Sequence, residues 1–175
     1  MKIRSIVNVS CCLALLSMST GVAAQSELRW QNVDINQQNR EPRRAVFFAY
    51  ESMDKAQSFD KKNSANYLSM EGMWKFNFVK DHNKRPANFF ATNYDDSNWK
   101  DFPVPGLFEL NGYGDATYKN IGYAWETQFD PKPPYISEIN NYTGSYRRTF
   151  ELPKDWKGKD VYFHVGSATS NLTLW

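Results

Sequence analysis

Residues 101–150 read DFPVPGLFELNGYGDATYKNIGYAWETQFDPKPPYISEINNYTGSYRRTF, and this stretch decides the fold. Glycines, prolines and aromatic residues alternate in it at a density that a helix does not tolerate, because glycine and proline destabilise helix interiors. Its central part, 106–135, is predicted to be an ordered loop with tight reversals at Gly112, Gly114 and Gly122. So long a loop inside a compact domain is usually functional.

Short runs of alternating polarity flank this loop. Residues 73–79 come before it and place Trp74, Phe76 and Phe78 on one face of a strand. Further strands are predicted after it at 142–152, 160–165 and 171–175. This spacing favours an all-β sandwich or jelly roll, and with about six strands where a jelly roll has about eight, we expect it to be incomplete at its C-terminus.

The segments between the strands carry turn and core signals. Pro103 and Pro105 bracket an edge segment, because proline cannot donate a hydrogen bond to a neighbouring strand. Residues 93–97 (NYDDS) read as a turn, so the adjacent pair Asp95 and Asp96 is predicted to be structural. Trp74 and Trp99 are predicted core residues.

The first 24 residues are typical of a secretory signal peptide. Lys2 and Arg4 supply its positive charge, residues 6–18 are mostly apolar or small, and Val22-Ala23-Ala24 fits a cleavage site that leaves Gln25 as the new N-terminus. A membrane anchor is disfavoured, because a spanning helix needs about 20 predominantly apolar residues. We expect export to the periplasm or secretion, and no membrane contact after cleavage.

Composition excludes several classes of function for the mature chain. Both cysteines, Cys11 and Cys12, lie inside the signal, so no disulfide, thiolate metal site or cysteine nucleophile remains. Of the 21 basic residues, Lys2 and Arg4 are removed with the signal, which leaves 19 against 19 acidic residues. A neutral chain with dispersed basic residues gives no footprint for nucleic acid.

The mature N-terminus is polar and has few structural signals. Residues 25–39 read as an extended arm with Trp30 as its large anchor, and this arm leaves homo-oligomer formation open. Residues 46–50 alternate and would suit a short strand. Ser52 is expected to cap a helix of one or two turns within 52–58.

Several motifs, in order, resemble glycoside hydrolase family 2. GMWKF (72–76) resembles the G-x-W-x-F strand of the family's sugar-binding jelly roll, and YDDSNW (94–99) followed by VP resembles its DDSxW…VP stretch. GYGDATYKNIGYAW (112–125) resembles the Y-x-N loop of the family's β-galactosidases, and GSYRRTFELP (144–153) resembles the strand that follows it.

The resemblance departs from the family pattern at three positions. Phe108 stands where the family usually has Trp, and Ala116 and Ala124 stand where prolines are common. These departures weaken the assignment to the β-galactosidase branch and not the assignment to the family. β-Glucuronidases and β-mannosidases are therefore the nearest alternatives within it.

The resemblance implies a fold and a division of the chain. It implies a galactose-binding-like jelly-roll β-sandwich at 67–175, preceded by an extended N-terminal arm at 25–66 and the signal peptide at 1–24. The function implied is that of the N-terminal, non-catalytic sugar-binding domain of an exported β-galactosidase, which hydrolyses terminal β-D-galactosyl residues with retention. A free-standing carbohydrate-binding module and a purely structural domain remain the alternatives.

The catalytic glutamates of the family lie in a TIM barrel, so no catalytic residue is expected in this chain. The resemblance assigns substrate binding to Asn120, whose amide offers a donor and an acceptor to a sugar hydroxyl. From the residues alone, Asn120 would instead support a turn beside Gly122. Tyr118, Tyr123 and Trp125 are predicted to pack and pin this loop rather than to form a stacking rim.

No cofactor and no metal site are expected in this chain, since the family's magnesium and sodium sites use residues outside it. His82 and His164 have no partner at ligand spacing, and both are predicted to be non-catalytic, His164 as a strand residue. The partners implied by the resemblance are a β-galactoside and the immunoglobulin-like and TIM-barrel domains that follow in family members.

Overall fold

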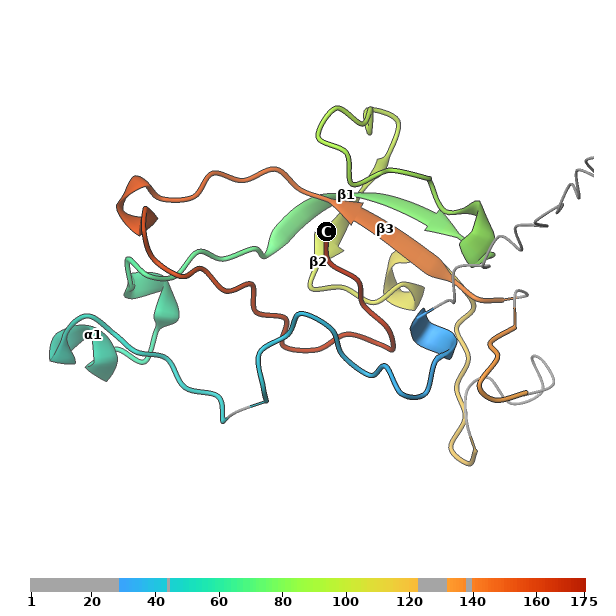
Figure 1. Cartoon of the computed structure of the whole chain (residues 1–175), viewed down its shortest axis with the longest axis horizontal. Helices are drawn as coiled ribbons and strands as arrows, with labels where there is room; N and C mark the ends of the chain where they lie inside the picture. Colours follow the sequence, from blue (N-terminus) through green and yellow to red (C-terminus); the bar gives the residue numbers. More distant parts are fainter. Residues whose placement is uncertain (1–28, 44, 123–131, 138–139) are drawn as a thin grey trace, which may run out of the picture.

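The computed structural model describes residues 29–43, 45–122, 132–137 and 140–175. The strands of these residues form a three-stranded antiparallel sheet in the order β2–β1–β3 (Figure 1). β1 is Gly72–Val79, β2 is Lys100–Val104 and β3 is Thr143–Arg147. The helices are short, so the described chain is consistent with the all-β class that the sequence predicted.

The hydrophobic core forms around Phe76 in the middle of β1. Phe76 and Phe102 of β2 are each 1% exposed, and their ring centroids lie 4.4 Å apart. Tyr146 of β3 packs on Phe76 at 4.7 Å. Phe108, which precedes the 3₁₀ helix η4 (Glu109–Asn111), adds a fourth ring at 5.6 Å. The predicted alternation of β1 therefore delivers its central aromatic residue into the core.

Arg147 holds the loop between β1 and β2 to the sheet. Because neighbouring strand residues point to opposite faces, Arg147 faces away from the core that Tyr146 enters. Its Nε donates to Asp96 Oδ2 at 2.7 Å, and its Nη1 donates to the carbonyls of Phe89 and, at 2.9 Å, Ala91. This loop rises above the strands in Figure 1, whereas η4 lies below them.

The predicted structural roles of Asp95 and Trp99 are confirmed, whereas the core prediction for Trp74 in β1 is not. Asp95 Oδ1 accepts a hydrogen bond from the Ser97 N–H, and this bond holds the pKa of Asp95 below its usual value. Trp99 is 9% exposed and packs on Tyr94. Trp74, also predicted for the core, is half-buried, because it lies near the start of β1 beneath the guanidinium of Arg148.

The N-terminal segment contacts the rest of the domain at the buried side chain of His82. His82 begins the 3₁₀ helix η3 (His82–Lys84) and is 3% exposed. Trp30, in the 3₁₀ helix η1 (Arg29–Gln31), meets the His82 ring edge-on at 5.5 Å. Asn141 Nδ2 lies 3.1 Å from His82 Nδ1. The large anchor predicted from the sequence, Trp30, is thus in contact with the body of the domain.

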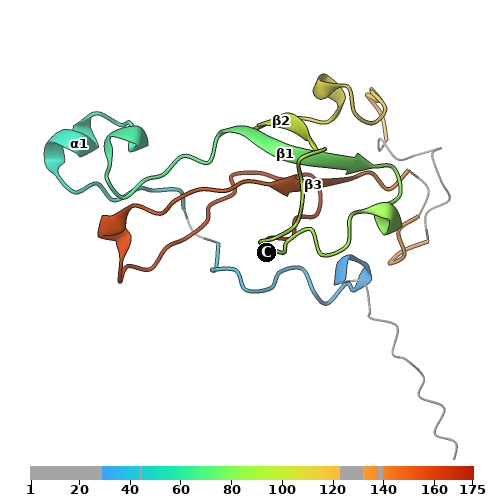
Figure 2. The same ribbon diagram turned by 90° about the horizontal axis from the view of Figure 1, so that it is seen from above.

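One end of the molecule contains the helix α1 (Met53–Gln57) and the 3₁₀ helices η2 (Lys61–Asn63) and η5 (Lys154–Trp156). The predicted cap of α1 is confirmed, since Ser52 Oγ accepts from the Lys55 N–H at 3.3 Å. Both ribbon views place α1 and η5 at the end of the molecule opposite residues 113–122 (Figures 1 and 2).

Glu51 organises the segment that follows α1. Its Oε1 accepts from Ser64 Oγ at 2.8 Å and from the Asn66 N–H at 3.2 Å. Hydrogen bonds from its own backbone N–H and from Ser64, with Lys55 nearby, lower the pKa of Glu51 to about 2. Trp156 Nε1 donates to the Ala65 carbonyl at 2.7 Å, which ties η5 to the same segment.

Several strand predictions are wrong in the described structure. Residues 46–50, 160–165 and 171–175 have no strand structure, and β3 ends at Arg147 instead of continuing to residue 152. A strand needs a neighbour whose backbone groups pair with its own. The alternating residues at 160–165 and 171–175 have no such neighbour among the described residues, so their apolar side chains stay exposed.

Gly144 is predicted to be essential to the core. A Cβ at this position would lie 2.6 Å from Phe76 Cε2 and 2.8 Å from Phe108 Cζ. Gly144→Ala should therefore lower the free energy of unfolding by about 1–3 kcal/mol, the usual cost of an overpacked core. Urea unfolding followed by tryptophan fluorescence measures this loss. Gly166→Ala is the control, because nothing lies within 4 Å of a Cβ there, and equal stability of both variants would contradict the prediction.

Glu51 is predicted to make stability sensitive to acid. Its pKa of about 2 in the folded chain lies below the ordinary value of 4.5. The contribution of Glu51 to stability is therefore complete above pH 4.5 and is lost as the pH falls toward 2. Glu51→Gln should therefore reduce the decrease in the urea midpoint between pH 4.5 and about pH 2. Glu71→Gln, which removes an exposed carboxylate 3.8 Å from Lys62 Nζ, should leave more of the fall in place.

Candidate functional site

Asn120 lies in an irregular segment that leaves the sheet after η4. Its side chain is exposed. The predicted reversals around it are confirmed by positive φ angles of 80° at Gly112, 75° at Gly114 and 84° at Gly122. Such angles are readily adopted by glycine, which has no Cβ. We call residues 113–122 the Asn120 loop.

Tyr113 anchors the start of the Asn120 loop in the core. Its ring lies 4.9 Å from Phe76 and 5.3 Å from Phe78. Its N–H donates to the Phe108 carbonyl at 2.9 Å, which closes the turn around η4. The Asn120 loop is therefore attached to the aromatic core at its first residue.

A second anchor joins the Asn120 loop to the residue before β3. The Tyr142 hydroxyl donates a hydrogen bond to Asp115 Oδ2. This bond, together with partial burial and the nearby negative charge, raises the pKa of Tyr142. Burial raises the pKa of Tyr146 to about 12. Both phenols are therefore protonated at neutral pH, and Tyr142 acts as a donor.

The prediction that aromatic side chains pin the loop by packing is wrong for Tyr118, which is 90% exposed. Ile121 is exposed as well, at 84%. The other two residues of that prediction, Tyr123 and Trp125, lie outside the described residues. The described part of the loop is pinned instead by Tyr113 and by the Asp115–Tyr142 hydrogen bond.

The carboxylates singled out in the sequence have structural partners. Asp95 is hydrogen-bonded to the backbone of Ser97, and Asp96 is ion-paired with Arg147 at 2.7 Å. In the described ranges, no three histidine, cysteine or acidic side chains gather where they would hold a metal ion. None of the helices described is long and apolar enough to span a membrane.

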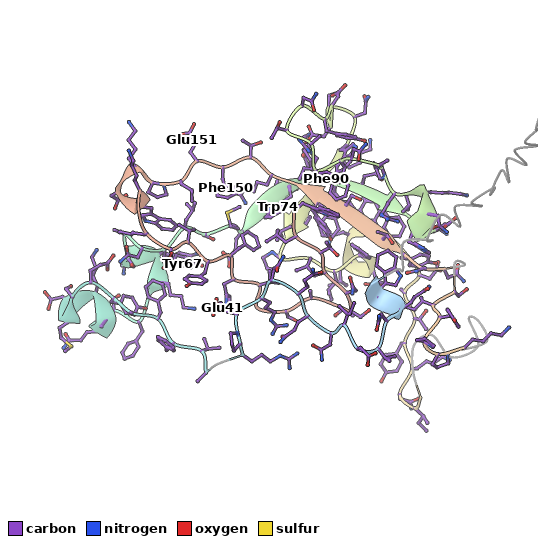
Figure 3. All side chains as sticks on the ribbon, viewed as in Figure 1. Glu41, Tyr67, Trp74, Phe90, Phe150 and Glu151 are labelled. Atoms are coloured by element: carbon purple, nitrogen blue, oxygen red, sulfur yellow. The ribbon has the colours of Figure 1, made fainter. Side chains whose placement is uncertain are left out.

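The two histidines have different environments. His82 is buried between Trp30 and Asn141. His164, predicted to be a strand residue, lies in the exposed irregular segment after η5, so that prediction is wrong. Figure 3 shows the labelled residues Tyr67 and Phe150 toward the α1 end of the molecule, and Trp74 near its middle at the beginning of β1.

Sequence reasoning missed two contacts that shape this region. The Asp115–Tyr142 and Asp96–Arg147 pairs join residues 27 and 51 positions apart. No motif at such separations predicts a pair.

Comparison with known proteins identifies relatives over most of the chain. Residues 67–175 match the family model described as "Glycosyl hydrolases family 2, sugar binding domain". A β-galactosidase of Priestia megaterium is 32% identical over 144 residues, which are 82% of this chain and 14% of that protein. A β-galactosidase of Halalkalibacterium halodurans is 28% identical over 151 residues, 86% of this chain and 15% of that protein.

A third relative is named as one subunit of an enzyme. The β-galactosidase large subunit of Leuconostoc lactis is 32% identical over 127 residues, which are 66% of this chain and 20% of that subunit. The chain thus spans 14–20% of the length of these three relatives. Since the family model covers more than half of the chain, the resemblance read from the motifs is confirmed: the chain belongs to glycosyl hydrolase family 2, and residues 67–175 match its sugar binding domain.

Proposed function

We propose that this chain is the N-terminal, non-catalytic sugar-binding part of an exported β-galactosidase that removes terminal β-D-galactosyl residues with retention. One observation carries the proposal: relatives named β-galactosidase match 82–86% of this chain but only 14–15% of their own length. Such proportions are expected when the shared segment is one domain of a larger enzyme. Residues 1–24 would direct export to the periplasm or the medium.

The adjacent carboxylate pair singled out in the sequence is not arranged for bond cleavage. Retention requires two carboxyl groups about 5–5.5 Å apart, one as acid and base and one as nucleophile. The adjacent carboxylates Asp95 and Asp96 are occupied by Ser97 and Arg147. In the proposed enzyme the catalytic pair, and any magnesium or sodium ion, would belong to other parts of the polypeptide.

Asn120 is the residue proposed to touch the substrate. It is exposed on an anchored loop, and its amide can donate to one sugar hydroxyl and accept from another. A contact of this kind orients the galactosyl unit without taking part in proton transfer. In the enzyme it would complete a sugar subsite whose other side is formed by the domain that holds the catalytic carboxylates.

The proposed architecture is a galactose-binding-like jelly roll. The three-stranded sheet and its aromatic face would form one part of such a sandwich. An immunoglobulin-like domain and a TIM barrel are the proposed partners within the same polypeptide.

Substitution of Asn120 tests the substrate contact. In the full-length enzyme, Asn120→Ala should lower kcat/KM for an aryl β-galactoside at least about fivefold, since a lost hydrogen bond to a sugar hydroxyl costs roughly 1–3 kcal/mol. Asn120→Asp keeps the shape and the acceptor but removes the donor, so it separates the two functions of the amide. Asn171→Ala is the control for loss of an exposed amide elsewhere. Unchanged kinetics for Asn120→Ala would remove this residue from the site.

Expression of residues 25–175 alone separates an enzyme domain from a free-standing module. We expect no hydrolysis of aryl β-galactosides and poor solubility, because apolar residues at 160–165 and 171–175 are exposed. Size-exclusion chromatography measures the oligomeric state, thermal melting measures cooperative folding, and titration with galactose measures sugar binding. A monomer that melts cooperatively and binds galactose would favour the free-standing module.

A further inference from the structure

We propose that Tyr142 is a positioning residue for Asn120. Its hydroxyl hydrogen bond to Asp115 fixes the beginning of the Asn120 loop and thereby sets where the Asn120 amide stands. The inference rests on the proposed function, because it takes Asn120 as the group that meets the sugar. Tyr142 itself needs no contact with the substrate.

The Tyr142 ring is held in place before its hydroxyl acts. It packs on Phe78 of β1 with ring centroids 5.5 Å apart, and Lys80 Nζ lies 5.9 Å from the ring centroid. Its position immediately before β3 makes it continuous with the sheet. The Tyr142 hydroxyl therefore belongs to a rigid part of the domain, and its hydrogen bond restricts the motion of Asp115.

Gly114 lets the loop approach this ring. It adopts a φ of 75°, and a Cβ built on it would lie 3.1 Å from Tyr142 Cδ2. A side chain at this position would push the loop away from the ring and strain the backbone as well. The sequence Gly114-Asp115 thus combines a close approach with an acceptor for the hydroxyl.

The geometry explains why the bond matters at Asn120. Tyr113 and Asp115 are both fixed, so the chain leaves the domain in a set direction at the beginning of the loop. Asn120 follows five residues later, a stretch that reaches at most about 17 Å when extended. If the Asp115 anchor is lost, more of the chain before Asn120 moves freely, and fewer of its positions place the amide against the sugar.

A double-mutant cycle in the full-length enzyme tests the coupling. Tyr142→Phe should lower kcat/KM for an aryl β-galactoside about three- to tenfold, the fold-change that corresponds to the net contribution of one intramolecular hydrogen bond. Because Tyr142 acts through Asn120, the same change should have no further effect in an Asn120→Ala background. Asp115→Ala should match Tyr142→Phe, whereas Asp115→Asn should retain most of the activity, since its amide oxygen still accepts from the hydroxyl. Tyr162→Phe removes an exposed hydroxyl elsewhere and serves as the control.

Trypsin cleavage after Lys119 reports loop order without relying on activity. Tyr142→Phe and Asp115→Ala should accelerate this cleavage in the same full-length enzyme, whereas Tyr162→Phe should not. The rate is measured by mass spectrometry of the products over time. It depends on how often the loop opens, so it responds to the anchor whether or not Asn120 binds sugar.

Each outcome has a distinct meaning. An equal loss of kcat/KM from Tyr142→Phe with and without Asn120 would overturn the inference and make Tyr142 a structural residue only. Unchanged cleavage after Lys119 would overturn the anchor itself. A silent Asn120→Ala would instead defeat the proposed function and with it the positioning of a sugar contact, and faster cleavage in Tyr142→Phe would then identify a loop anchor with no role in binding.

Discussion

The structure depends on the close approach of the β3 backbone to the Phe76 ring. Gly144 stands where any side chain would collide with Phe76 and Phe108. Because it has none, β3 lies flat against the rings, and Tyr146 enters the core two residues later at 4.7 Å from Phe76. A core built from so few rings in contact gains its stability from the area they bury together, so a small displacement of one strand affects every pair.

The opposite face of the sheet is organised by the charge of Arg147 together with the packing of the buried Trp99 on Tyr94. Arg147 presents five N–H donors in a fixed plane, and its surroundings use them for one carboxylate and two carbonyls. The Tyr94 ring lies 5.5 Å from the guanidinium and covers it. Two backbone carbonyls of the long β1–β2 loop are bonded to this one side chain, which ties the loop to the sheet. Asp96 is therefore committed to the fold, which is why an adjacent pair of acidic residues here is no sign of catalysis.

Features that depend on residues close together in the sequence could be predicted, and features that depend on contacts between distant residues could not. β1 and the Ser52 cap were predicted because a few adjacent residues determine them. The segments at 160–165 and 171–175 have equally good alternation, but a strand exists only with a paired neighbour, and alternation does not say whether one is present. The Asp115–Tyr142 bond joins residues 27 positions apart and leaves no local pattern. The residues alone gave Asn120 no more than a turn, and its assignment to sugar binding came from the family resemblance.

An exposed amide contributes to a binding site only if its loop is already ordered. A hydrogen bond contributes a net ~0.5–1.5 kcal/mol, whereas fixing the backbone of one free residue costs ~1–2 kcal/mol. Ordering even two residues at the moment of binding would cancel the free energy that one hydrogen bond of the Asn120 amide contributes. The cost must therefore be met during folding, by contacts that exist before the sugar arrives. Tyr113 in the core and Asp115 on Tyr142 are contacts of this kind, and both lie at the end of the loop that the sheet already holds rigid.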